Sequence, residues 1–87
     1  MDRNLIRYFW NCGDDGIIQF ALLRAHLNKH EKDVIEMMLD NCCTQEEAAE
    51  LMGYSVRRVQ EWWYSATGKL LSIPWVIAYA KQLQSTL

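Results

Sequence analysis

The sequence predicts a compact all-α bundle of about five helices that contains a helix-turn-helix. Three observations lead to this prediction. The 87 residues include one proline and four glycines, so few positions interrupt a helix. Apolar residues make up 51% of the chain and recur at helical spacing, which is enough for one modest core. Residues 44–55 combine a helix-capping signature with a glycine corner, which indicates two consecutive helices.

Residues 1–30 are expected to form a helical pair. Asp2 can cap a first helix, whose apolar stripe is Leu5, Ile6, Phe9 and Trp10. Gly13 is expected to stop that helix, and residues 13–16 are typical of a turn. Residues 17–27 are apolar on nearly all sides, which predicts a helix that is central in its domain or buried in a partner. Residues 28–31 are polar and are expected to be a short connection.

Residues 32–40 predict the next helix, with Asn41 as its left-handed stop and four inward side chains, Val34, Ile35, Met38 and Leu39. Thr44 and Glu47 then form a capping box that opens a helix over residues 45–52. The apolar residues of that helix are Ala48, Ala49 and Leu51. Gly53 closes it, because the sharp turn there needs a residue that tolerates positive φ.

Ser55 caps the following helix, which is expected to run out near residues 67–68. Its inward residues are Val59, Trp62, Trp63 and Ala66. Val59 and Trp62 are expected to fix it in the core, with Trp63 at the edge. The last helix begins at Pro74, which a first turn tolerates, and carries one stripe of Ile77, Ala80 and Leu83. The chain is thus one domain over residues 1–87, with a helical pair (1–30), a helix-turn-helix core (31–70) and a C-terminal helix (71–87).

Composition narrows the class of protein. Charged residues make up 23% and the net charge is −2, which excludes a disordered chain and argues against strong non-specific binding of nucleic acid. Residues 1–43 hold seven acidic and five basic residues, whereas residues 44–87 hold four of each. No apolar run approaches the roughly 20 residues of a membrane span. No signal peptide is evident, so a cytoplasmic protein without membrane contact is expected.

Neither catalysis nor metal binding is expected. The three cysteines, Cys12, Cys42 and Cys43, lack the spacing of a zinc site and are expected to be reduced and mostly buried. His26 and His30 are four residues apart and could share a helix face, but two histidines do not make a structural metal site. The chain also lacks paired carboxylates, a phosphate-binding loop and a nucleophile–base pattern. We expect no cofactor and no enzymatic activity.

The stretch from Thr44 to Val59 resembles the C-terminal promoter-reading domain of bacterial sigma factors and the wider sigma-like and LuxR-like helix-turn-helix group. Those domains share Thr-x-Glu-Glu, then Ile or Ala followed by Ala, and after two further residues Leu, Gly, an aromatic residue or Ile, and Ser. After the Ser they have a Val, an apolar residue, an Ala and a Lys-Leu pair. At the same offsets this chain has Val59, Trp62, Ala66, Lys69 and Leu70. The resemblance covers residues 31–70. It implies a DNA-binding domain whose second helix enters the major groove.

The resemblance also implies which residues contact DNA. The outward positions of the second helix would be Val56, Arg57, Gln60, Glu61 and Tyr64, with Arg58 on the flank. An arginine there suits guanine or phosphate, Gln60 suits adenine and Glu61 suits cytosine. Backbone contacts would come from Thr44, Gln45 and Ser55. The chain lacks the promoter-melting domain of a working sigma factor, and its second helix is less basic and more aromatic than is usual in the family.

Two functions follow as hypotheses. The first is a sequence-specific transcriptional regulator of a phage or mobile element that binds double-stranded DNA as a homodimer, because one unit of this size buries little surface on DNA. The apolar faces of residues 17–27 and 73–83 would supply the dimer contact or simply the core. The alternative is a small acidic module that keeps the fold but binds a protein partner, such as an anti-CRISPR-like inhibitor of a nucleic-acid enzyme or a protein that binds RNA polymerase.

Overall fold

Six helices follow one another in the computed structural model, which describes residues 4–11 and 14–85 and shows no β-strand among them. They are α1 (Leu5–Trp10), α2 (Asp15–Ala25), α3 (Lys29–Ile35), which continues into a π-helical turn (Glu36–Asp40), α4 (Gln45–Met52), α5 (Val56–Leu71) and α6 (Pro74–Ser85). The predicted all-α class is confirmed. No described helix is long and apolar enough to cross a membrane.

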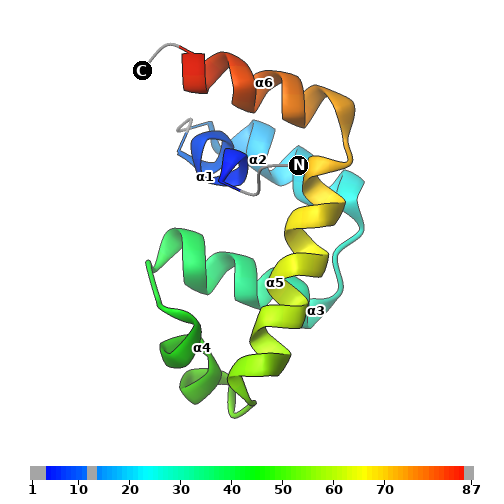
Figure 1. The fold of residues 1–87 in the computed structure, drawn as a ribbon. Helices are drawn as coiled ribbons and strands as arrows, with labels where there is room; N and C mark the ends of the chain where they lie inside the picture. Colours follow the sequence, from blue (N-terminus) through cyan, green and yellow to red (C-terminus); the bar gives the residue numbers. More distant parts are fainter. Residues whose placement is uncertain (1–3, 12–13, 86–87) are drawn as a thin grey trace.

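The longest helix, α5, joins the two ends of the molecule (Figure 1). Near its start it packs on α3 and α4, and farther along it contacts α1, α2 and α6. Its side chains reach the core along its whole length, from Val59 through Ala66 to Leu70 and Leu71, all of which are fully buried. The position of every other helix is therefore set against α5.

The helices α1 and α6 close the opposite end of the molecule from α4 by packing on each other. Phe9 of α1 meets the edges of Trp75 and Tyr79 at ring-centroid distances of 6.1 and 6.0 Å. All four apolar positions predicted for α1 are buried. Pro74 begins α6 as expected, with Val76 and Ala80 as its buried residues. The cap predicted at Asp2 and the stop at Gly13 lie outside the described residues.

The chain between α2 and α4 differs from the prediction in two places. Residues 28–31 are not a connection, because Asn28 and Glu31 form a capping box that begins α3 at Lys29. The left-handed residue after the π-helical turn is Cys42, with φ 54°, whereas Asn41 keeps φ at −95°. The wider turn carries the backbone past Asn41 before the chain reverses, and the Cys43 N–H donates to the Met37 carbonyl at 2.9 Å.

The interior of α5 also differs from the prediction. The helix does not end near residues 67–68 but continues to Leu71. Thr67 is fully buried, and its hydroxyl donates to the Trp63 carbonyl at 2.8 Å, so this polar residue is accommodated inside the helix. The two tryptophans exchange their expected roles. Trp63 is buried, whereas Trp62 is only half-buried.

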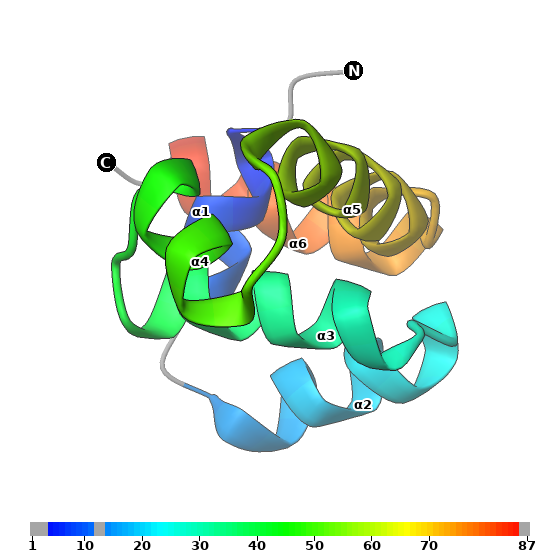
Figure 2. The same cartoon turned by 90° about the horizontal axis from the view of Figure 1, so that it is seen from below.

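The apolar helix α2 is peripheral rather than central and forms an outer edge of the molecule (Figure 2). It begins at Asp15, inside the expected turn. Asp14 caps this helix, because its side chain accepts a hydrogen bond from the Ile17 N–H. His26 ends α2 in the left-handed conformation and His30 lies in α3, so they do not share a helix. Cys42 is exposed and Cys43 half-buried, so the expectation of mostly buried thiols is wrong for them; Cys12 is outside the described residues.

Candidate nucleic-acid interface

Two helices, α4 and α5, meet at a three-residue corner formed by residues 53–55. The capping box predicted for α4 is present: the Thr44 hydroxyl accepts from the Glu47 N–H at 3.2 Å, and the Glu47 carboxylate accepts from the Thr44 N–H at 3.1 Å. Gly53 has φ 76°, as the turn requires. Ser55 caps α5 by accepting from the Arg58 N–H at 3.2 Å. Local hydrogen bonds thus define where each helix starts and stops.

The exposed side of α5 carries Arg57, Glu61 and Tyr64, which lie on one stripe because their spacing is i, i+4, i+7. The cations at the start of α5 are Arg57 and Arg58, with side chains that are 89% and 59% exposed. Both approach Glu61, at 3.6 Å and 3.9 Å. Such exposed ion pairs contribute little to stability, about 0–1 kcal/mol, so both arginines can exchange Glu61 for another anion.

The other expected contact residues have different surroundings. Val56 is half-buried and packs against the core, and Gln60 is also half-buried. The Gln60 amide donates to Gln45 at 2.9 Å and so links α5 to α4. Thr44 and Ser55 are exposed, and each hydroxyl oxygen already accepts a capping bond. Their hydroxyl protons remain available for donation to an anion.

An aromatic cluster that the sequence analysis did not anticipate lies at the corner. His30 of α3 stacks on Trp62 with ring centroids 4.4 Å apart and an interplanar angle of 5°. Tyr54 packs edge-on against Trp62 at 4.9 Å and forms a hydrogen bond with His30 at 3.2 Å. The Arg58 guanidinium lies 5.7 Å from the Trp62 ring. The cluster holds the corner against α3 and places the Arg58 side chain beside Trp62. These contacts account for the position of Trp62 near the surface.

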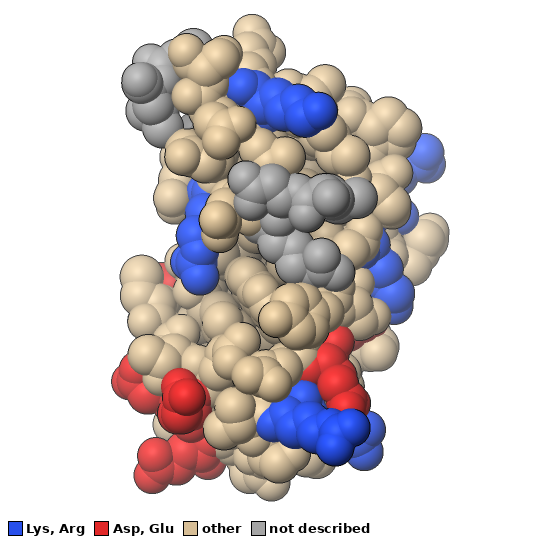
Figure 3. Space-filling model, viewed as in Figure 1, with Lys and Arg blue, Asp and Glu red and all other residues tan. Residues whose placement is uncertain are grey.

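Both signs of charge occur at this end of the molecule. Figure 3 shows acidic side chains gathered over the region of α4 and basic side chains beside them over the start of α5. The exposed acidic residues of α4 are Glu46, Glu47 and Glu50. An anionic ligand such as DNA would therefore meet the start of α5 favourably and the exposed side of α4 unfavourably.

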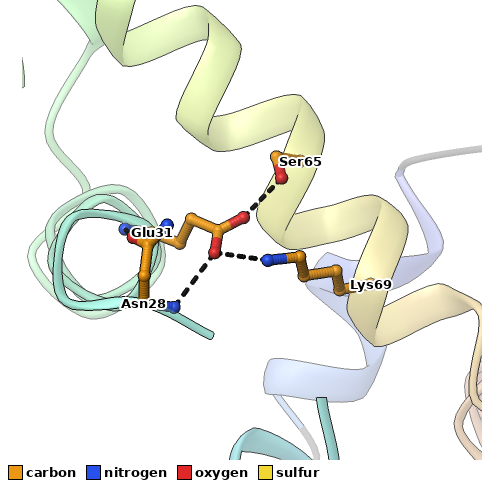
Figure 4. A network of polar contacts seen from close by, with 4 residues as sticks. All are labelled: Asn28, Glu31, Ser65 and Lys69. Carbon is orange, nitrogen blue, oxygen red and sulfur yellow. Dashed lines mark hydrogen bonds and ion pairs between the residues drawn. The ribbon is translucent and has the colours of Figure 1, made fainter. Parts of the chain in front are cut away.

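A polar network around the buried Glu31 carboxylate links α3 to α5 (Figure 4). The Glu31 side chain is 1% exposed and accepts from Lys69 at 2.7 Å, from the Asn28 N–H at 3.0 Å and from the Ser65 hydroxyl. Burial alone would raise the pKa of the Glu31 carboxyl. The hydrogen bonds from Lys69, Ser65 and Asn28, together with the Lys69 charge, outweigh burial and hold the pKa below its ordinary value.

The described residues contain no group of three or more histidine, cysteine or acidic side chains placed to hold a metal ion. Comparison with models of known protein families, with curated proteins and with solved structures finds no match.

Proposed function

We propose that this chain is a sequence-specific DNA-binding protein, a transcriptional regulator in which α4, the corner and α5 act as a helix-turn-helix. The start of α5 enters the major groove, and α4 lies across the backbone. One observation carries the proposal: Arg57 and Arg58 project from the first turn of a helix whose start is exposed and whose position is fixed by a cap, a corner and an aromatic cluster.

The parts of this surface would have separate roles on DNA. Arg57 and Arg58 bind guanine edges or phosphates, and Tyr64 lies on the same exposed stripe, where it can pack on the backbone. Thr44 and Ser55 donate their hydroxyl protons to phosphates. Gln60 is a positioning residue, because its amide is used in the bond to Gln45. Glu61 holds the two arginines when DNA is absent and competes with phosphate for them.

The test is selection from a random duplex DNA library, at low and then at physiological salt, followed by binding titrations on the enriched sequence. The Arg57→Ala/Arg58→Ala variant should lose at least about tenfold in affinity, and the slope of log K against log salt should fall by about 2. The matched control is Lys32→Ala/Lys81→Ala, which removes two exposed cations from α3 and α6. Equal losses in both variants would mean that only overall charge matters and that this helix does not bind DNA specifically.

Glu61→Gln separates two roles of that side chain. If Glu61 only competes for the arginines, the variant should bind DNA more tightly, because one negative charge is removed from the interface. Weaker binding confined to sites with a particular cytosine would show instead that Glu61 contacts a base.

A second candidate function is favoured by the exposed side of α4. There Leu51 is 69% exposed beside Glu46, Glu47 and Glu50, a combination that suits a basic protein surface better than DNA. In that case the α4–α5 unit is a scaffold for binding a protein partner, such as a nucleic-acid enzyme. The selection experiment distinguishes the two candidates, because a protein-binding module would enrich no sequence even at low salt.

A further inference from the structure

One side of α2 carries apolar side chains that the described part of the chain leaves uncovered. Leu23 is 73% exposed and Phe20 is 54% exposed, values expected of polar surface residues. Only Ile18, Ala21 and Leu22 of this helix are buried. Two large apolar residues one turn apart on the outer edge of a small domain indicate a contact surface.

The exposed side of α2 borders a groove that it forms with α6. The groove has a volume of about 630 Å³ and an almost entirely apolar lining, contributed by Asp14, Gly16, Ile17, Phe20, Trp75 and Tyr79. Phe20 and Trp75 form its aromatic wall, with ring centroids 5.8 Å apart. The groove lies along the first half of α2, whereas Leu23 projects from the second half.

Charges of opposite sign stand at the two ends of this side of α2. Asp14 lines the groove at the start of the helix. Arg24 lies one turn beyond Phe20 and is exposed. Neither side chain takes part in any of the ion pairs found within residues 4–11 and 14–85. A helix face that is acidic at one end, apolar in the middle and basic at the other end is complementary to an antiparallel copy of itself.

We propose that this face binds a second copy of the chain, with the two α2 helices packed antiparallel. Asp14 and Arg24 are ten residues apart, about 15 Å along a helix, so a twofold axis near Gln19 brings Asp14 of each copy to Arg24 of the other. The same register places Leu23 of each copy opposite residues 15–16, at the groove of the other. Each copy thus inserts Leu23 into the partner's groove, and the two contacts are identical by symmetry.

The first test is sedimentation velocity over a concentration series. The chain should sediment at its monomer mass of 10.2 kDa when dilute and at twice that mass when concentrated. Leu23→Asp should weaken dimerisation by at least about tenfold, because it places a charge in an apolar groove. The control is Leu51→Asp on α4, where a leucine of similar exposure should tolerate the same change. A chain that is monomeric at every concentration, or equal losses in both variants, would overturn the proposal.

The second test addresses the antiparallel register. Arg24→Glu should weaken the dimer, since it sets an acid opposite Asp14 at both ends of the interface. Adding Asp14→Asn should recover much of that loss, because asparagine removes the charge and still caps the helix. No recovery would overturn this register. The proposed dimer surface does not include Arg57 or Arg58, so the dimer and the proposed function can fail separately. A monomer that binds DNA would overturn only the dimer. A dimer that binds no DNA would overturn only the proposed function.

Discussion

The ion pair between the buried Glu31 and the partly exposed Lys69 gives a quantitative test of how α3 is held against α5. The variant is Lys69→Met, which keeps the aliphatic stem and removes the ammonium group that donates to Glu31 at 2.7 Å. The carboxylate then keeps only Ser65 and the Asn28 N–H as partners, in a site that leaves it 1% exposed. Removing one partner from a fully buried pair costs about 3–5 kcal/mol.

The cost here is smaller, because the Lys69 side chain is 43% exposed and water screens part of its interaction. We expect a loss of about 2–3 kcal/mol in the free energy of unfolding at pH 7, which corresponds to roughly 10–20 °C in Tm for a domain of this size. The measurement is urea unfolding followed by circular dichroism. Lys81→Met is the control, because Lys81 is exposed on α6 and its replacement should change stability by less than about 0.5 kcal/mol.

The dependence on pH makes the test specific. In the wild-type chain the pKa of Glu31 is lowered, so its contribution to stability is present above the ordinary pKa of 4.5 and is lost as the pH falls through the folded-state pKa. Burial raises the pKa of Glu31, and in Lys69→Met the hydrogen bond and charge of Lys69 no longer oppose it, so that pKa lies higher than in the wild type and the variant is penalised most at neutral pH. The difference between variant and wild type should therefore shrink at acidic pH. A loss that is the same at pH 7 and pH 4, or no larger than that of Lys81→Met, would refute this account of the network.

Three further predictions concern the packing of α4 and α5. Val59→Asp should leave the chain unfolded, since Val59 is fully buried and the new charge would have no partner; a cooperative melting curve like that of the wild type would contradict this. Trp63→Ala should cost about 3–5 kcal/mol in denaturant unfolding, and Trp62→Ala clearly less, because only Trp63 is buried; the reverse order would show that the two rings are assigned wrongly. Gly53→Ala should cost about 1 kcal/mol through backbone strain alone, since φ is 76° and a Cβ there meets nothing within 4 Å. Gly53→Asn should cost less, because asparagine adopts the left-handed conformation more readily than alanine. Equal losses in the two variants would argue against the left-handed conformation at residue 53.

Local signals in the sequence predicted local structure well. The Thr44–Glu47 capping box, the positive φ of Gly53 and the Ser55 cap are all present, because each depends on residues within one turn of each other. The same signature at Asn28 and Glu31 was available in the sequence. However, Lys29 and His30 make that segment polar and no apolar stripe follows at once, so the sequence pattern favours a connection there over a helix start.

Features that depend on residues far apart in the chain were not predictable in this way. Trp62 and Trp63 are both compatible with an inward position by spacing alone. Contacts with His30 and Tyr54, which come from other parts of the chain, hold Trp62 near the surface. The Gln45–Gln60 bond likewise depends on the angle between α4 and α5. It changes Gln60 from an expected contact residue into a link between helices, whereas Arg57 and Arg58 are as exposed as the sequence predicted.

The pairing of α1 with α6 has a consequence for how the chain folds during its synthesis. α1 is made well before α6, yet Phe9 packs against Trp75 and Tyr79, which follow more than sixty residues later. At a translation rate of about 5–20 residues per second, that delay lasts roughly 3–13 s. During this interval the apolar side of α1, including Ile6 and Phe9, has no α6 to cover it. The nascent chain therefore presents a short apolar segment that chaperones can bind before α6 leaves the ribosome.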